Sequence, residues 1–303
     1  MTKRVGAALA LLIIIALCPL LVSAFWVFVI IEIMISALYA VSFNLLLGYG
    51  GMLAFGYAIF YGVGAYALAI LEVKLGIGAL PAAIAAPFVA AAVGGLIAYF
   101  CIRLSGIYFG MLTFAFQMLA YAIFVKSYDL TGGDDGLHGV VIPGVLGTPT
   151  GLYFLVFAVV VLCLYAMWRI VQSPFGMALQ AQRNNPVKSL AIGVNVSFQR
   201  WAAIVIASFF AGAAGALSGF ANQSVFPDWV DWRASAVPIV MTILGGMNNF
   251  AGPIVGAAIY VLLQTVMTGY TEYWALFMGA LIILIVMLLP DGVMHLLSRR
   301  RDV

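Results

Sequence analysis

Long apolar runs fill most of this chain, and they limit the folds that it can adopt. A helix needs about 20 mostly apolar residues to cross a bilayer. The chain is 66% hydrophobic and only 8% charged, whereas about a quarter of the residues in a typical globular protein are charged. We therefore predict an all-α integral membrane protein. Ten windows reach or approach the spanning length: 5–23, 25–47, 52–71, 79–101, 107–125, 151–168, 201–221, 235–247, 253–270 and 273–290.

The expected architecture is a polytopic bundle of about 8–10 transmembrane helices, forming one domain over residues 1–303. Window 52–71 is rich in glycine and window 235–247 is short, so these two are candidates for broken or re-entrant helices buried inside protein. The first window follows Lys3 and Arg4 and ends in LVSA, which also fits a secretory signal peptide. Because a long apolar run follows at once, an uncleaved first helix is favoured.

Positive charge indicates how the spans are oriented, because cytoplasmic loops are enriched in lysine and arginine. Residues 169–200 contain four basic residues and no acidic one, and the tail contains three arginines at 299–301. We therefore place segment 169–200 and both termini in the cytoplasm, as ten spans allow. Loops 126–150 and 222–233, each with a net negative charge, then face outside.

Several kinds of chemistry lack the residues that they need. No G-x-x-x-x-G-K-[ST] motif is present, so ATP has to be bound by a partner, and we expect no cofactor on this chain. Only two histidines occur, the three cysteines lie in apolar runs, and no H-E-x-x-H is found, which argues against a metal site. The absence of G-x-S-x-G argues against a serine hydrolase. The formal net charge of +3 indicates orientation rather than binding to nucleic acid.

Charged and polar residues inside spans are costly, and they are the default functional candidates in a membrane protein. Glu32 is the only charge clearly within a span, and Asn44 and Gln117 are further polar residues in spans. We predict these three as pathway residues. For Glu32 two readings stay open, a polar pathway or a structural hydrogen bond to a neighbouring helix. Other polar residues lie near span ends: Asn222, Gln223 and Gln264.

The stretch LTGGDDGLHG, residues 130–139, concentrates four glycines and two carboxylates in an apolar chain. It has no lysine for a phosphate loop, and its adjacent aspartates lack the alternation of a calcium loop. The glycines permit tight bends with positive φ. What remains is a turn-rich, net-negative loop that faces outside, and a structural cap on the helices is one role for it. The residues concerned are Thr131, Gly132, Gly133, Asp134, Asp135 and Gly136.

Residues 172–200 carry the signals of two short helices. Ser173 before Pro174 and Asn185 before Pro186 are typical helix starts, and Gly193 is a plausible stop. A positive, helical insertion of this length between spans suggests a docking site for a partner, with a merely solvated surface loop as the alternative.

Glycines suggest where helices approach closely. Three G-x-x-x-G pairs begin at Gly106, Gly215 and Gly252, and packing within one bundle is the simplest reading. A faint internal echo also links residues 46–70 with 243–263, since both pass from a Gly-Gly turn through a Phe and a Gly into a helix rich in small residues. An internal duplication would explain this echo, and shared composition explains it nearly as well.

The chain resembles the permease subunits of ABC importers for branched-chain amino acids. These importers have two permeases, and the chain is closer to the LivM-like one than to the LivH-like one. The resemblance covers nearly the whole chain. It rests on NLLLGYGGMLAFGYAIFYGVGAYALAIL (44–71), YFGMLTFAFQML (108–119), LTGGDDGL (130–137), SPFGMALQAQRNNPVKSLAIGVNV (173–196) and GGMNNFAGPIVGAA (245–258).

The resemblance implies a multi-pass protein of the bacterial inner membrane that works by alternating access. Its implied partners are a second, LivH-like permease, two ATP-binding cassette subunits that bind the ATP, and a periplasmic or lipid-anchored substrate-binding protein. It also places the helix that couples to the ATPase within residues 173–196, and it implies an outer gate or a docking site for the binding protein at LTGGDDGL, with the structural cap as the alternative. The residues that keep the family pattern there are Phe175, Gly176, Ala178, Leu179, Ala181, Arg183 and Gly193, whereas Gln180, Asn185 and Pro186 depart from it.

Other functions stay open at this stage. A permease of the same type could carry urea or short amides. A membrane-embedded enzyme acting on lipid or isoprenoid would use the loop at 130–139 as its acid site. A stand-alone channel or carrier is a third alternative, but an ion-coupled carrier usually needs more buried carboxylates than this chain has.

Overall fold

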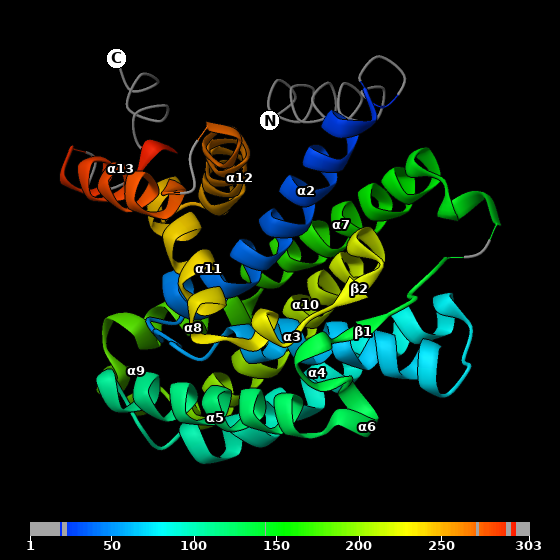
Figure 1. The fold of residues 1–303 in the computed structure, drawn as a ribbon. Helices are drawn as coiled ribbons and strands as arrows, with labels where there is room; N and C mark the ends of the chain where they lie inside the picture. The colour runs from blue at the N-terminus through cyan, green and yellow to red at the C-terminus, as the bar shows by residue number, and fades with distance from the viewer. Residues whose placement is uncertain (1–18, 20–22, 143, 271–272, 289–291, 295–303) are drawn as a thin grey trace.

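The fold consists almost entirely of helices (Figure 1). The structure is a computed structural model, and it describes residues 19, 23–142, 144–270, 273–288 and 292–294. The apolar window at 5–23 and both charged termini lie mainly outside these ranges. The longer helices are α2 (Ala24–Asn44), α3 (Ala58–Ala69), α4 (Ala79–Cys101), α5 (Ile107–Lys126), α7 (Pro149–Val171), α8 (Pro174–Asn184), α10 (Val196–Asn222), α11 (Trp232–Gly245), α12 (Gly252–Tyr270) and α13 (Trp274–Leu288).

Short elements connect these helices. Two π-helical turns, η2 (Leu45–Tyr49) and η3 (Ile70–Lys74), extend α2 and α3. The remaining short elements are α6 (Tyr128–Thr131), η4 (Gly133–Asp135), β1 (Leu137–His138), η5 (Gly144–Gly147), α9 (Pro186–Ala191), β2 (Ser224–Val225) and η6 (Pro227–Val230).

Six helices in the described ranges are long and apolar enough to cross a membrane, which confirms a polytopic all-α protein. They are α2 with its π-helical extension, α4, α5, α7, α10 and α12. The weak windows 52–71 and 235–247 form α3 and α11, with 12 and 14 residues. At a rise of about 1.5 Å per residue, helices of this length are too short for a hydrocarbon core of about 30 Å.

Helix α3 is buried inside the bundle along almost its whole length. Because lipid cannot satisfy the polar groups of a helix end, other segments of the chain must do so. At its start, Ser235 Oγ accepts a hydrogen bond from the Ala58 main-chain nitrogen at 2.9 Å. The Tyr57 hydroxyl lies 2.9 Å from Ser42 Oγ and 3.1 Å from the main-chain oxygen of Ala207. Side chains and main chain of neighbouring helices therefore support this short helix.

Helix α10 is the central packing element, and α3 and α4 lie against it (Figure 1). Glycines allow these close approaches. A Cβ atom at Gly215 would overlap the main-chain oxygen of Tyr61, and one at Gly256 would overlap that of Met241. Gly110 is similarly close to Phe55, whereas a Cβ at Gly106, with φ of +59°, would meet open space. The G-x-x-x-G pairs thus pack within the chain, apart from Gly106, which forms a turn.

The two loops predicted to face outside are joined to each other. Strands β1 and β2 pair antiparallel, with Leu137 opposite Val225 and His138 opposite Ser224. Segment α8–α9 precedes α10 and β2 follows it, so a helix of 27 residues, about 40 Å long, separates them. Figure 1 shows α9 at the left of the bundle and α6 with β1 at the right. We call these the α8–α9 end and the ribbon end of the molecule.

Candidate functional site

The α8–α9 end carries the two short helices that the proline signals predict. Ser173 occupies the position before α8, but its hydroxyl donates to the Ile170 main-chain oxygen at 2.6 Å and makes no side-chain cap. Asn185 does cap α9, because its Oδ1 accepts from the Lys188 main-chain nitrogen at 3.0 Å. Gly193, with φ of +87°, ends this helix as predicted.

One face of α8 is anchored on the bundle. Leu179 is fully buried, and Phe175 is half-buried against the core. A Cβ atom at Gly176 would overlap the main-chain oxygen of Val171 at the end of α7. Three residues of the predicted coupling set therefore hold α8 in place on the bundle.

Arg183 also faces the bundle with its guanidinium group. Its Nη1 donates a hydrogen bond to the main-chain oxygen of Gly48. A Cβ atom added at Gly51 would lie only 2.8 Å from the Arg183 Cγ atom. A cavity of about 210 Å³ opens beside this contact. Its lining comes from α8 and from both glycine turns of the internal echo: Gly48, Tyr49, Gln180, Arg183, Asn184, Met247 and Asn248.

Several large apolar side chains of this segment are exposed, alongside polar ones such as Gln180 and Asn184. The exposed fractions of Met177, Val187, Leu190 and Ile192 are 60%, 73%, 58% and 76%. Ala181 is exposed, Ala178 is half-buried, and Gly193 is exposed. These apolar side chains lie beside Lys188, at an end of the bundle rather than along a spanning helix. A cluster of large apolar residues at such a place indicates an interaction surface. We call Met177, Val187, Leu190 and Ile192 the apolar docking face.

At the ribbon end, the stretch 130–139 forms a compact turn. Thr131 is buried, and its Oγ1 lies 2.5 Å from the Phe124 main-chain oxygen and 2.8 Å from that of Ser127. Gly132, Gly133 and Gly136 all have positive φ. Asp134 and Asp135 are exposed, and the Tyr128 hydroxyl donates to Asp135 at 3.3 Å. The glycines therefore have the bending role that the sequence predicts.

Hydrogen bonds tie this turn to its neighbours. His138 Nδ1 lies 2.9 Å from Ser224 Oγ in the second loop, and Nε2 lies 3.0 Å from the Asp135 main-chain oxygen. Glu72 Oε1 accepts from the Val141 main-chain nitrogen at 3.0 Å. Burial raises the pKa of Glu72, and this hydrogen bond partly opposes the rise. In the described part of the chain, no three His, Cys, Asp or Glu residues gather as metal ligands would.

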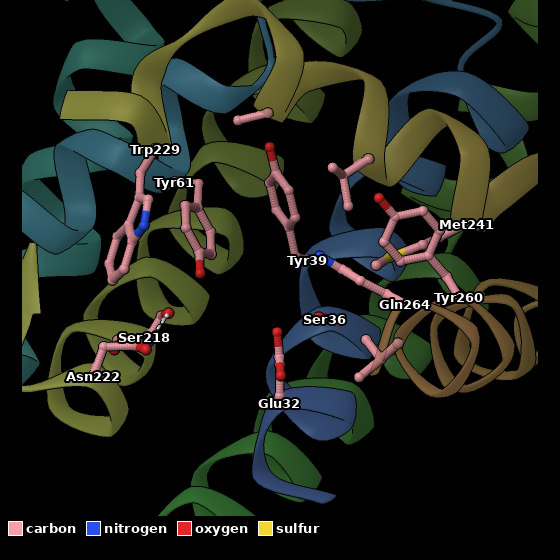
Figure 2. Close-up of a pocket in the computed structure, with 13 residues that line it drawn as sticks. Glu32, Ser36, Tyr39, Tyr61, Ser218, Asn222, Trp229, Met241, Tyr260 and Gln264 are labelled. Atoms are coloured by element: carbon pink, nitrogen blue, oxygen red, sulfur yellow. Dashed lines mark hydrogen bonds between the residues drawn. The ribbon is translucent and has the colours of Figure 1, made fainter. Parts of the chain in front are cut away.

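A cavity of about 320 Å³ lies between the helices and contains Glu32 (Figure 2). Its lining comes from α2, α3, α10, η6, α11 and α12. The residues are Glu32, Ser36, Tyr39, Tyr61, Ser218, Asn222, Trp229, Ala234, Val237, Met241, Tyr260, Val261 and Gln264. The cavity thus brings Glu32 together with Asn222 and Gln264, polar residues that the sequence placed in or near three different spans.

The other two predicted pathway residues lie elsewhere. Gln117 is fully buried, and its Nε2 donates to the main-chain oxygens of Val230 and Asp231 at 2.9 and 2.8 Å. Its Oε1 accepts from Ser235 at 3.0 Å, so it joins α5 to η6 and α11. Asn44 is also fully buried, and neither of its amide atoms has a hydrogen-bond partner in the described structure. It lies beside Gly48, close to the Arg183 contact.

Comparisons with known proteins show the family to which the chain belongs. The model of the family described as branched-chain amino acid transport system / permease component matches residues 25–286. The "high-affinity branched-chain amino acid transport system permease protein LivM" of Salmonella typhimurium is 28% identical, over 94% of this chain and 74% of that protein. The Escherichia coli protein of the same name is 27% identical, over 94% and 73%.

More distant similarities also occur. A "probable branched-chain amino acid transport permease protein LivH" of Methanocaldococcus jannaschii is 27% identical, over 40% of this chain and 38% of that protein. Among solved structures, PsaBC from Streptococcus pneumoniae in complex with Fab covers 88% of this chain and 92% of that chain, with a TM-score of 0.49 and 17% identity. That structural similarity is too low to support an argument.

Proposed function

The chain belongs to the family of branched-chain amino acid transport permease components, and we propose that it is the LivM-like permease subunit of an ATP-driven importer for these amino acids. The family consists of permeases, so the chain is a transport subunit and not an enzyme acting on membrane lipid. The six candidate spans make it a multi-pass membrane protein.

The apolar docking face is the observation that carries this proposal beyond family membership. Met177, Val187, Leu190 and Ile192 are exposed at the end of the bundle where positive charge predicts the cytoplasm. The chain has no P-loop of its own, so energy from ATP must enter through contact with another protein. We assign this face to docking on one of two ATP-binding cassette subunits, which bind the ATP.

The ribbon end is suited to the other partner. If the α8–α9 end is cytoplasmic, the paired loops 126–150 and 222–233 face outside, and both termini are cytoplasmic in a bacterial inner membrane. A periplasmic or lipid-anchored binding protein then delivers the amino acid at β1 and β2. The match to a LivH relative supports a second, related permease that completes the pathway.

Transport by alternating access requires that ATP favour one conformation of the permease over another. The contact of Arg183 with Gly48 supplies a direct connection from α8 to the end of α2. The same cavity also includes Met247 and Asn248, between α11 and α12. Movement of α8 would therefore act on two glycine turns at once, and through them on the spanning helices around Glu32.

Purification of the tagged chain from its native membrane tests the assembly. In mild detergent, we expect a second permease and ATPases with a P-loop to copurify in fixed proportion. Recovery of the chain alone, with turnover of a lipid substrate by the purified protein, would contradict the proposal. An importer permease for urea or short amides would give the same assembly, so competing solutes in an uptake assay must separate that alternative.

A further inference from the structure

The cavity that contains Glu32 lies near the ribbon end of the bundle. Asn222 is the last residue of α10, and Trp229 belongs to η6, which follows β2. Glu32 lies roughly 24 Å along α2 from Gly48, which contacts α8 at the opposite end. A solute released at the paired loops would therefore meet this cavity before it reached the α8–α9 end.

Among the residues that the structure describes, Glu32 is the only charged one that lines the cavity. In the described ranges, the only ion pair found joins Arg233 to Asp231, so no basic residue neutralises Glu32 there. Glu32 is an exposed residue of α2 in this chain. An uncompensated carboxylate within a membrane-spanning helix is costly and marks a functional site by default. Its negative charge favours a cation at this position.

Aromatic rings surround the same space, as Figure 2 shows. The ring centroids of Tyr39 and Tyr61 are 4.7 Å apart, and those of Tyr61 and Trp229 are 5.9 Å apart. Tyr260 lines the cavity from the opposite side, on α12. The faces of tyrosine and tryptophan rings attract ammonium groups. Rings and carboxylate thus favour the same kind of ligand.

The rest of the lining fits an aliphatic zwitterion. Val237, Met241 and Val261 offer apolar surface for a branched side chain, and the Gln264 amide and tyrosine hydroxyls can donate hydrogen bonds to a carboxylate. The described part of the lining contains no lysine or arginine that would hold that carboxylate strongly. Weak binding suits a site from which the solute must leave after each cycle.

We propose that this cavity is a transit site for an amino acid, in which Glu32 and the surrounding aromatic rings bind the α-ammonium group. The inference rests on the proposed import function and adds the place and the group that the permease recognises. A neutral solute such as urea or a short amide has no ammonium charge to pair with the Glu32 carboxylate.

A reporter cysteine tests the site without using transport as its readout. Cys18, Cys101 and Cys163 are replaced by alanine in the complete transporter, and Ser36→Cys is introduced one helical turn from Glu32. The reaction rates of this thiol with a cationic and an anionic methanethiosulfonate reagent are compared. We expect the cationic reagent to react faster, and Glu32→Gln to reduce that preference by about tenfold. Ser197→Cys, in the first turn of α10 at the α8–α9 end, is the matched control, and Glu32→Gln should not alter its rates.

Protection of the Ser36→Cys thiol identifies the group recognised. Leucine should slow its modification, whereas 4-methyl-2-oxopentanoate, which has the same side chain but no ammonium group, should not. Glu32→Gln should abolish protection by leucine. Equal protection by both compounds, or a charge preference unchanged in Glu32→Gln, would overturn the inference. If wild-type transporter still imports leucine in that case, the proposed function stands and only the transit site fails.

Discussion

The guanidinium group of Arg183 donates a hydrogen bond to the main-chain oxygen of Gly48, and this contact joins α8 to the turn that ends α2. Gly51 lies against the same side chain, and Met247 and Asn248 line the adjoining cavity. Arg183, one of the seven residues of the predicted coupling set, therefore points toward the spanning helices. In our account, the partner ATPase contacts the outer face of the segment, and Arg183 transmits the movement inward.

Replacement of Arg183 tests this connection. Arg183→Ala removes a hydrogen bond from a charged donor, worth about 1 kcal/mol or more, and we expect ATP-driven uptake to fall by roughly tenfold. ATP hydrolysis should continue, because the docking face is unchanged. The measurement is the ratio of solute imported to ATP hydrolysed, with Lys126→Ala, where α5 ends at the ribbon end, as the control. An unchanged ratio in Arg183→Ala would contradict this role.

A charge on the docking face should release the ATPase. Ile192 is 76% exposed, so Ile192→Asp should leave the fold intact but weaken an apolar contact by about 2 kcal/mol, as at a typical interface hot spot. The amount of ATPase that copurifies with the permease measures the effect. Ile192→Leu, which keeps the apolar surface, should retain it. Equal recovery from both variants would show that the partner docks elsewhere.

The close approach at Gly176 should make this position sensitive to a single methyl group. Because a Cβ would overlap the Val171 main-chain oxygen, Gly176→Ala must displace α8 from α7, at a cost of about 1–3 kcal/mol. We expect a lower melting temperature of the detergent-purified protein. Ala181→Val adds two methyl groups at an exposed position on the same helix and should have little effect. Similar melting temperatures for the two variants would argue against the tight contact.

The turn at the ribbon end offers a matched pair of glycines. Gly136 has φ of +75° and ψ of −170°, and a Cβ there would overlap the Val225 main-chain oxygen. Gly139 also has positive φ, but a Cβ there would meet open space. Gly136→Ala should therefore destabilise the pairing of β1 and β2 by about 2–3 kcal/mol, and Gly139→Ala by about 1 kcal/mol.

Faster hydrogen exchange of the β1 and β2 amides would show the loss of pairing in Gly136→Ala. If the ribbon receives a binding protein, this variant should also bind that protein more weakly than Gly139→Ala does. Unchanged exchange in Gly136→Ala would mean that the turn does not hold the two loops together.

Local signals predicted the helical parts of this protein well. Spanning windows such as 79–101 and 107–125 match α4 and α5 closely, because hydropathy over about 20 residues is a property of the segment itself. The same holds for α8 and α9, since proline at a first helical position and glycine after a helix act locally. The glycine-rich window 52–71 and the short window 235–247 correspond to the short helices α3 and α11.

Contacts between distant segments were beyond sequence patterns. Strands of two residues in polar loops have no alternation to detect, so the pairing of His138 with Ser224 could not be foreseen. The helical pattern of residues 173–196 also does not predict that the Arg183 side chain contacts Gly48 whereas the Ile192 side chain is exposed. Glu32 was identified as a costly charge, but its grouping with Asn222 and Gln264 depends on how α2, α10 and α12 pack.

Uptake of radiolabelled leucine into proteoliposomes tests the central claim most directly. The vesicles contain this chain with its second permease and ATPases, enclosed ATP at the cytoplasmic face, and the binding protein outside. We predict accumulation that requires ATP and the binding protein and that stops when this chain is omitted. Accumulation at the same rate without the ATPases, or without this chain, would contradict the account.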